Sequence, residues 1–405
     1  MYSFLIIWAN IASIFQLLMY PNLYYAFKDL FGVEIGPLRF VNSFGFFVAL
    51  AFLVGAAILT AELRRKSQAG LLHPTEDEIT VGEKATAGEL IINFLLGFLL
   101  GYKILALFFL SSEATQDPQA FIFSGMGSWP LGLAVGALFA GLKYWEKKKE
   151  ELAKPEKRKV RIWPQDRVGE ITVLALIFGL VGAKLFDIFE NWSGFVQDPA
   201  AYLFSPSGLT FYGGLICATI AIIIYARKHK IPVVHLADAI APPLMIAYAI
   251  GRIGCQVAGD GDWGIVNLAP NPISWLPDWM WSYTFPNNVN EAGVPIPGCV
   301  GKYCNQLPQP VYPTAFYETV MGFILFGVLW AVRKSLKPFG AVFALYLILN
   351  GLERFLIEKI RVNNEMELFG FHPTQAEVIS TCLMIAGVVL WIILAQKKGA
   401  NPKKV

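Results

Sequence analysis

The sequence predicts an all-α polytopic membrane protein with about nine transmembrane helices and one small segment on the outer side. Of its 405 residues, 55% are hydrophobic and 16% are charged, whereas a soluble globular chain carries about 25% charged residues. The mean hydropathy is +0.51, and charged residues gather between apolar stretches that approach the ~20 residues needed to span a bilayer. These observations exclude a disordered chain and a nucleic-acid-binding tail, and five cysteines are too few for a secreted disulfide scaffold.

Nine stretches are long enough and apolar enough to be expected as spanning helices. In chain order they are 44–62, 90–110, 128–145, 171–188, 212–227, 236–254, 315–333, 339–357 and 376–395. Residues 1–19 are also apolar, but they carry no flanking charge and Pro21 follows them. Either an interfacial helix or a tenth span fits this stretch. It has no basic start and no small-residue cleavage site, so we do not expect a cleaved signal peptide.

The distribution of lysine and arginine predicts the orientation of these helices. Basic residues follow the first, third, fifth, seventh and ninth predicted spans, most densely in Lys143–Arg167. Segments 111–127 and 189–211 contain no lysine or arginine. Segment 255–314 contains only Lys302. Because cytoplasmic loops carry the excess of basic residues, we expect the N-terminus outside, the C-terminus inside, and 255–314 as the large outer segment.

Two helix pairs share a sequence pattern at a constant offset of 81 residues, from Gly88 to Gly169. The matching positions are a Gly-Glu pair before each first helix, a lysine within it, and a Gln-Asp-Pro turn after it. They are Gly88-Glu89 with Gly169-Glu170, Lys103 with Lys184, and Gln116-Asp117-Pro118 with Gln197-Asp198-Pro199. Chance similarity between two apolar pairs would not place these polar residues at one offset, so we infer a duplication.

The duplication divides the chain into three predicted parts. These are 1–62, an N-terminal segment with the first span; 63–168, an inserted helix pair with a basic inner loop; and 169–405, the membrane core. The inserted pair is a degenerate copy of 169–230, with Leu131 at the position of Tyr212. We hypothesise that it is a structural or docking appendage, and that a chain lacking 88–165 keeps its chemistry.

Charged residues inside the predicted spans mark candidate functional positions, because a charge in a bilayer is costly and usually faces a partner or a cavity. They are Lys184, Asp187, Asp238, Arg252, Glu353, Arg354 and Glu358. Arg252 and Arg354 lie at one depth, near the outer ends of the sixth and eighth spans. A planar guanidinium group suits a phosphate or a carboxylate, so the pair predicts a lipid phosphate site. The alternative is two arginines tied to Asp260, to Glu358 or to helix carbonyls.

Other polar groups favour a structural role. Glu358 follows Arg354 by four residues, which predicts an ion pair on one helix face. Asp260 lies in a glycine-rich turn whose Asp-Gly-Asp run does not continue into a calcium loop, and the four histidines show no metal spacing; we expect no metal. Cys299 and Cys304 lie in the outer segment, where oxidation is permitted, and a disulfide between them is favoured over two free thiols.

Several short motifs occur in the order found in one family of bacterial membrane enzymes. They are Ile35-Gly36-Pro37, Tyr212–Ile216, Asp238–Pro242, Gly251–Gly254 with Trp263-Gly264, Tyr312–Glu318, Gly351–Arg354 with Glu358, and Gln375 with Ser380. On these motifs the chain resembles the prolipoprotein diacylglyceryl transferases, from about residue 35 to 62 and again from about 170 to 395. The resemblance does not extend over the inserted helix pair.

The resemblance implies an activity and its substrates. Members of the family transfer the diacylglyceryl group of phosphatidylglycerol to the lipobox cysteine thiol of a preprolipoprotein, the first step of bacterial lipoprotein maturation. The resemblance implies no cofactor and no nucleic-acid partner. It also implies a multi-pass protein of the bacterial inner membrane with a periplasmic N-terminus and a cytoplasmic C-terminus. Segment 255–314 would then be the periplasmic head that admits the signal peptide.

The resemblance also assigns site residues. The functional arginines of the family correspond to Arg252 and Arg354, and a histidine of the family corresponds to Tyr212, so these three are the candidate catalytic residues. The candidate substrate-binding residues are Arg252, Arg354, Asp260, Gly264, Glu358, Gly213 and Gly214. No metal ligand is implied.

Four positions depart from the family pattern. Tyr212 replaces a histidine, Phe44 a tyrosine, Cys255 an asparagine and Asp260 a glutamate. A phenol is a weaker base than an imidazole at neutral pH, so Tyr212 donates a hydrogen bond, another group accepts the thiol proton, or the chemistry has changed. The replacements at Phe44, Tyr212 and Cys255 favour a second hypothesis, a non-catalytic relative that binds lipid or a lipoprotein. A transporter ranks last, because the repeat is not inverted and covers only one helix pair.

Overall fold

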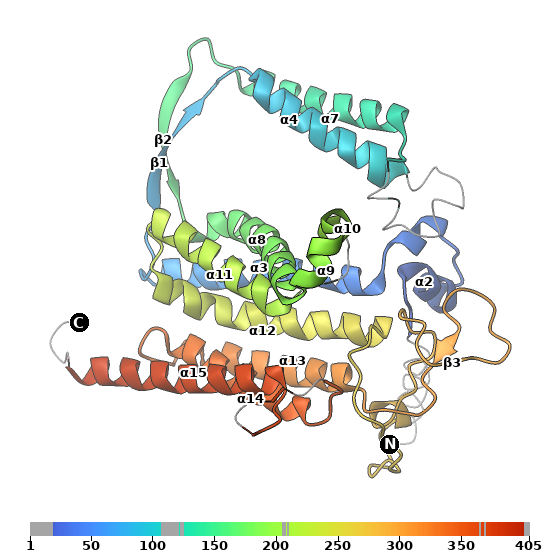
Figure 1. Ribbon diagram of the computed structural model, residues 1–405. Coiled ribbons are helices and arrows are strands. Elements are labelled where there is room, and N and C mark those ends of the chain that lie inside the picture. The colour runs from blue at the N-terminus through green and yellow to red at the C-terminus, as the bar shows by residue number, and fades with distance from the viewer. Residues whose placement is uncertain are drawn as a thin grey trace, which may run out of the picture. The chain divides into compact units, whose positions relative to one another are not determined.

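A computed structural model describes residues 19–106, 121, 125–204, 208, 210–363, 366–367 and 370–400. The described chain is mostly helical, as predicted, and Figure 1 traces its elements. Seven of its helices are long and apolar enough to cross a membrane, so the chain is a multi-pass membrane protein. Residues 1–18 lie outside the described residues. The two predictions for this stretch, a spanning helix and an interfacial helix, both remain.

Helices occupy all nine positions that were predicted to span the membrane. They are α3 (Ser43–Gln68), α4 (Ala87–Leu99) with its π-helical continuation η2 (Leu100–Leu105), α7 (Trp129–Glu150), α8 (Val168–Glu190), α11 (Phe211–Lys228), α12 (Val233–Ala258), α13 (Thr314–Val332), α14 (Ala341–Glu358) and α15 (Gln375–Ala400). The seven candidate spans leave out α7 and α14. α14 has three charged residues within its 18 residues, and the last turns of α7 are rich in charged residues. The count of nine is therefore approximate.

The described chain divides into two compact units. The first contains residues 1–72 and 231–405, and the second contains residues 73–230. Both copies of the predicted repeat belong to the second unit, whereas the sequence groups the second copy with the core. The predicted boundary at residue 168 rests on the repeat and stays a prediction.

In the first unit, α12 is the central helix. It packs against α3, α13 and α14, and α14 packs against α15. Gly322 of α13 lies against Ala249 of α12, where an added β-carbon would come within 2.9 Å of the alanine Cβ. Small residues therefore let these helices approach closely, and the approach brings the C-terminal ends of α12 and α14 to the N-terminal end of α13.

A group of buried charges joins the N-terminal ends of α12 and α14 to the C-terminal end of α3. Asp238 of α12 accepts hydrogen bonds from the backbone N–H groups of Gly340 (2.7 Å) and Phe343 (3.1 Å) at the start of α14. A carboxylate in this place caps the helix and faces the positive end of its dipole. Lys66 Nζ of α3 lies 3.7 Å from Asp238 Oδ2. Asp238, a charged residue at membrane depth, is thus a structural cap.

The outer segment between α12 and α13 has little regular structure. It contains η4 (Asp278–Met280) and a short antiparallel pair of β3 (Val294–Pro295) with β4 (Asn305–Gln306). Its small core contains Met19, Trp279, Tyr283, Phe285 and Val311. The predicted disulfide between Cys299 and Cys304 is present. Before α3, the chain forms α2 (Leu23–Phe31) and the short helix η1 (Gly36–Phe40).

In the second unit, α4 pairs with α7, and α8 pairs with α11 after the short helices α9 (Trp192–Gln197) and α10 (Pro199–Phe204). The shared lysine makes the same kind of contact in both pairs. Lys103 Nζ donates to the Met126 carbonyl (2.7 Å), and Lys184 Nζ donates to the Gly208 carbonyl (3.4 Å). The pairs are thus alike at this position, as the repeat predicts. The Gln-Asp-Pro turn of the first copy lies outside the described residues.

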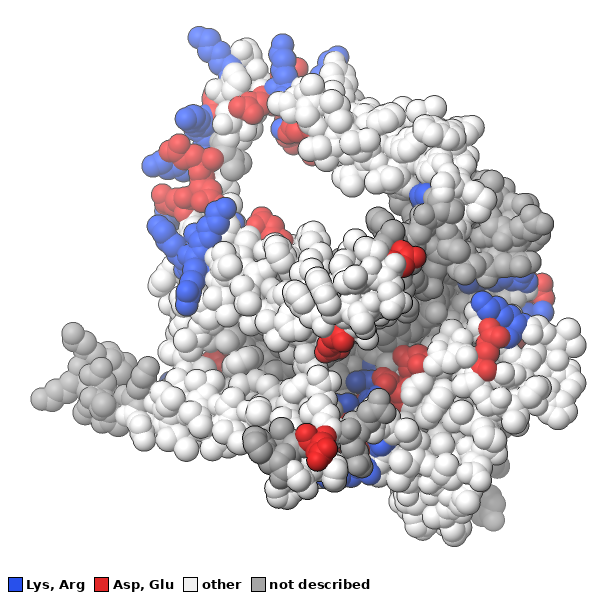
Figure 2. All heavy atoms as spheres, viewed as in Figure 1, with Lys and Arg blue, Asp and Glu red and all other residues white. Residues whose placement is uncertain are grey.

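A two-stranded antiparallel ribbon in the second unit was not predicted. Strand β1 (Thr75–Val81) pairs with β2 (Glu156–Ile162). The sequence predicts the segment that contains β2 to be a basic inner loop. The 3-10 helix η3 (Pro164–Arg167) follows β2. Figure 2 shows charged side chains of both signs gathered over this ribbon, at the upper left of the view. Cross-strand pairs of opposite charge, such as Glu76 with Arg161, stabilise such a ribbon.

The register of this ribbon predicts that the inserted helix pair can be removed without unfolding the rest. Glu78 and Lys159 are partners across the strands, so Asn-Gly in place of residues 79–158 would close a two-residue hairpin. The ion pair between Asp77 and Arg167, with a contact of 2.6 Å, would remain. We expect the shortened chain to melt cooperatively in detergent near the native temperature. The control is the same shortened chain with Val-Val in place of Asn-Gly. Because valine disfavours the positive φ values that the turn requires, the control should melt at a lower temperature than the Asn-Gly chain. Aggregation of the Asn-Gly chain would contradict the prediction.

Candidate functional site

The structure brings three guanidinium groups to one buried carboxylate. Glu318 of α13 has no exposed surface. Arg252 Nε lies 3.4 Å from Glu318 Oε2. The Nη1 atoms of Arg354 and Arg361 lie 3.4 and 3.3 Å from Glu318 Oε1. These arginines come from α12, from α14 and from the segment directly after α14, so Arg252 and Arg354 lie together as their equal depth predicts.

Arg354 is also held along its own helix. Its Nη2 lies 2.9 Å from Oε2 of Glu358, four residues later, so the predicted ion pair on one face of α14 is confirmed. Asn363 Nδ2 donates to Glu358 Oε1 at 2.6 Å. Both carboxylate oxygens of Glu358 therefore have partners, and the residue orients Arg354 toward Glu318.

Asp262, in the loop after α12, bridges two of the arginines. Its carboxylate forms ion pairs with Arg252 and Arg361, and Thr314 Oγ1 donates to its backbone carbonyl at 2.6 Å. Burial by itself would raise the pKa of Asp262, but the two guanidinium groups outweigh burial, and the pKa lies below its ordinary value. Asp262 is therefore anionic at neutral pH. Arg252 is thus tied to Asp262 and, among the described residues, not to Asp260, whereas Arg354 has the Glu358 partner that the alternative named.

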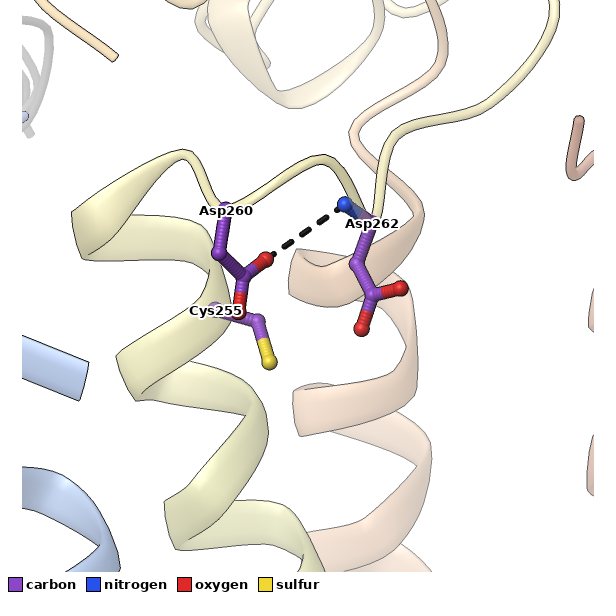
Figure 3. Close-up of side chains that lie close together, drawn as sticks. All are labelled: Cys255, Asp260 and Asp262. Atoms are coloured by element: carbon purple, nitrogen blue, oxygen red, sulfur yellow. Dashed lines mark hydrogen bonds between the residues drawn. The ribbon is translucent and has the colours of Figure 1, made fainter. Parts of the chain in front are cut away.

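Asp260 has a different environment from Asp262. Its Oδ1 accepts a hydrogen bond from the Asp262 backbone N–H at 3.4 Å, and Figure 3 shows its carboxylate beside the Cys255 thiol. Burial and the nearby charge of Asp262 raise the pKa of Asp260. One ligand atom from each of these three residues lies within 4.8 Å of the others, but a cation here would have to compete with two guanidinium groups for Asp262.

Gly264 fixes the loop that carries Asp262. The N–H of the next residue, Ile265, donates to the Ile360 carbonyl at 2.9 Å. An added β-carbon at Gly264 would lie 2.5 Å from that same carbonyl oxygen. Only glycine lets the loop lie against the segment that carries Arg361. The predicted role of Gly264 in substrate binding stays a prediction.

Two of the departures from the family pattern lie close together. Phe44, at the start of α3, packs against Gly254, where an added β-carbon would lie 3.3 Å from its Cα. Cys255 is the next residue, and its Sγ lies 3.8 Å from Arg252 Nη1. The replacements at positions 44 and 255 therefore lie next to one another, where α3 packs against the end of α12.

The remaining predicted site residues lie at the start of α11, in the second unit. Tyr212 is partly buried, and Gly213 and Gly214 are buried. An added β-carbon at Gly214 would lie 2.6 Å from the Gly179 carbonyl oxygen of α8. The two glycines therefore allow close packing of α8 with α11. The roles of all three residues toward a substrate stay predictions.

Sequence reasoning missed the carboxylate at the centre of the cluster and two of its partners. Glu318 is the one charged residue in the otherwise apolar helix α13, a signal that marks a functional position in a membrane span. Arg361 lies beyond the end of α14 at Glu358, so helical spacing from Arg354 could not have placed it in the cluster. Asp262 had no signal beyond its place in a turn, because its partners come from distant parts of the chain.

Three guanidinium groups around a buried carboxylate, near the ends of membrane helices, define an integral membrane protein whose site suits an anionic group such as a phosphate ester. The sequence profile of the family described as prolipoprotein diacylglyceryl transferase matches residues 131–393. The chain belongs to this family. The matched range begins within α7, earlier than the motifs indicate, and does not include 35–62.

Three relatives illustrate the similarity, and each is named phosphatidylglycerol–prolipoprotein diacylglyceryl transferase. The protein of Leptospira interrogans is 31% identical over 234 residues, which cover 52% of this chain and 66% of the relative, just under two thirds. The protein of Dehalococcoides mccartyi is 30% identical over 240 residues, or 59% and 81% of the two chains. The protein of Pasteurella multocida is 30% identical over 244 residues, or 58% and 79%.

The lowered pKa of Asp262 predicts how stability depends on pH. A carboxyl group with a depressed pKa in the folded state stabilises the fold above its unfolded pKa of about 3.9, and this contribution is lost as pH falls through the folded pKa. Asp262→Asn should therefore cost about 2 kcal/mol at pH 7, the value of a charge-assisted hydrogen bond. The difference from the native chain should shrink toward zero in acid.

The measurement is the melting temperature of both chains in detergent from pH 7 to pH 3. The exposed Asp29 gives a control, because Asp29→Asn should leave melting unchanged across the range. A constant difference between the native chain and Asp262→Asn down to pH 3 would show that the ion pairs do not stabilise the fold.

Proposed function

We propose that this chain transfers the diacylglyceryl group of phosphatidylglycerol to the lipobox cysteine thiol of a preprolipoprotein. The observation that carries the proposal is the convergence of Arg252, Arg354 and Arg361 on Glu318, in a chain that belongs to the transferase family. The names of the relatives supply the donor lipid and the acceptor protein.

In this proposal, Arg252 and Arg354 bind the phosphodiester of the lipid. Their side chains are 18% and 19% exposed, so they are held in the cluster but can still be reached. A guanidinium group presents a planar set of donors that matches two phosphate oxygens. Glu318 keeps the arginines in fixed positions, which lowers the entropy that binding would otherwise cost.

The reaction replaces one bond at the glyceryl carbon. The thiol sulfur attacks the carbon that carries the phosphate ester, a C–S bond forms, and the C–O bond to phosphate breaks. Glycerol phosphate leaves with the electron pair, and the thiol proton passes to a base. Negative charge grows on the leaving phosphate, and the two arginines stabilise that charge in the transition state.

Tyr212 is the candidate that contacts the thiol, as the residue at the position of the family histidine. The phenol would donate a hydrogen bond or accept the proton, and Gly213 and Gly214 would let substrate approach its backbone. Asp260 and Gly264 would contact the substrate from the loop beside the arginines. Glu358 would orient Arg354 for binding. No cofactor or metal takes part in this scheme.

The proposed location is the bacterial inner membrane. The excess of lysine and arginine after alternate spans supports a periplasmic N-terminus and a cytoplasmic C-terminus. This orientation places the outer segment 255–314 and the arginine cluster on the periplasmic side. There the signal peptide of an exported lipoprotein would meet lipid of the outer leaflet.

Arg252→Ala is expected to abolish lipoprotein processing, with a loss of about 10²–10³-fold in rate, the usual cost of one charge-stabilising group. The measurement is complementation in a bacterium depleted of its own transferase, together with the diacylglyceryl mass shift on a lipobox preprotein. Arg158 is exposed and lies on the β2 strand, so Arg158→Ala is a matched control that should process normally.

The same assay separates the proposal from a non-catalytic relative. One outcome is a native chain that inserts well into the membrane but processes neither the lipoproteins of the host bacterium nor its own native lipoproteins when phosphatidylglycerol is supplied. That result would favour a relative that binds lipid or lipoprotein without transferring the diacylglyceryl group. Full processing by Arg252→Ala would show that Arg252 takes no part in the reaction.

The chain with Asn-Gly in place of residues 79–158 is expected to keep processing within about threefold of the native rate, since changes that share no partners with a site act nearly independently of it. The reason is that the deletion spares α8, α11 and the whole first unit. Mass spectrometry of the lipobox preprotein provides the measurement. Loss of processing in a shortened chain that still melts cooperatively would show that the inserted helix pair is needed for activity.

A further inference from the structure

A tyrosine hydroxyl links the carboxylate of Glu318 to a second buried carboxyl group, that of Glu353. Tyr248 Oη lies 3.0 Å from Glu318 Oε1 and 3.2 Å from Glu353 Oε1. Glu353 is 4% exposed and lies on α14 directly before Arg354. The three groups form a short chain that starts at Glu353 and ends at the carboxylate that holds the arginines.

The number of available protons limits how this chain can be made. A phenol has one O–H to donate and lone pairs to accept, whereas an ionised carboxylate can only accept. If Glu318 and Glu353 were both ionised, three oxygens would share the single proton of Tyr248, and one contact would be a repulsion between lone pairs. Two good hydrogen bonds require that one carboxyl group carries a proton.

The surrounding charges indicate which carboxyl group is protonated. Glu318 has three guanidinium groups within 3.4 Å, and these offset its negative charge. No lysine or arginine nitrogen among the described residues lies within 4.0 Å of the Glu353 carboxylate, whose one hydrogen-bond partner there is Tyr248. An unpaired charge at membrane depth is costly, so the proton belongs to Glu353.

With Glu353 neutral, the charges of the residues that form the ion pairs of the cluster sum to zero. Arg252, Arg354 and Arg361 carry three positive charges, and Asp262, Glu318 and Glu358 carry three negative charges. An ionised Glu353 would leave one negative charge in excess beside the position proposed for the lipid phosphate. That excess would oppose the binding of an anion.

We propose that Glu353 is a neutral carboxylic acid that donates a hydrogen bond to Tyr248, which in turn donates to Glu318. In this role Glu353 and Tyr248 are positioning residues: they orient Glu318, and Glu318 holds the arginines. The effect on catalysis rests on the proposed transferase function, but the protonation of Glu353 does not. Glutamine can make the same donation through its amide, so Glu353→Gln should preserve the chain.

Infrared spectroscopy tests the protonation directly. The full native chain and Glu353→Gln are compared in lipid nanodiscs at neutral pH, in H₂O and in D₂O. We expect the native spectrum to contain a carbonyl band of a protonated carboxylic acid that moves to lower frequency in D₂O and is lost in Glu353→Gln. Tyr248→Phe should shift this band, because it removes the acceptor. If no such band distinguishes the native chain from Glu353→Gln, the proposal is overturned.

Activity tests the positioning role with a matched pair of variants. Glu353→Gln should transfer the diacylglyceryl group within about twofold of the native rate, and Glu353→Leu should be about tenfold slower, because it leaves Tyr248 without its donor. Equal rates for the two variants would overturn the positioning role. If the native chain transfers nothing, the proposed function fails, and the infrared band still decides whether Glu353 is protonated.

Discussion

The buried carboxylate of Glu318 is the interaction on which the site depends. Three arginines from separate parts of the chain meet at it, and without it their charges would repel one another at the end of a helix bundle. Removing one partner of a buried charged group commonly costs about 3–5 kcal/mol. The carboxylate therefore stabilises the packing of α12, α13 and α14 and also fixes the positions of the three guanidinium groups.

The helices can support this cluster because both of their ends are fixed by polar contacts. Asp238 caps the N-terminal end of α14, and the Gly264 loop lies against the segment that follows its C-terminal end. Between these ends, small residues let α12 and α13 approach closely. A bilayer contributes no hydrophobic force between helices, so close packing and satisfied polar groups must supply the specificity.

The departures from the family pattern are confined to particular places. Arg252, Arg354 and Glu358 match the family pattern and form ion pairs within the cluster. Phe44 instead packs against Gly254, directly before Cys255, whose thiol lies near Arg252. The charged residues of the cluster are thus retained, whereas two of the departures lie next to one another at the end of α12.

The sequence by itself determined the membrane class, the positions of the nine helices, the Cys299–Cys304 disulfide and the Arg354–Glu358 pair. Apolar runs, loop charge and helical spacing are local properties, and they can be read along the chain. Only the tertiary structure decided that Asp262 rather than Asp260 binds the arginines, that Glu318 is their common partner, and that β1 pairs with β2. Each of these joins residues 10 to more than 80 positions apart, and no local pattern records which distant partner satisfies a buried charge or a strand edge.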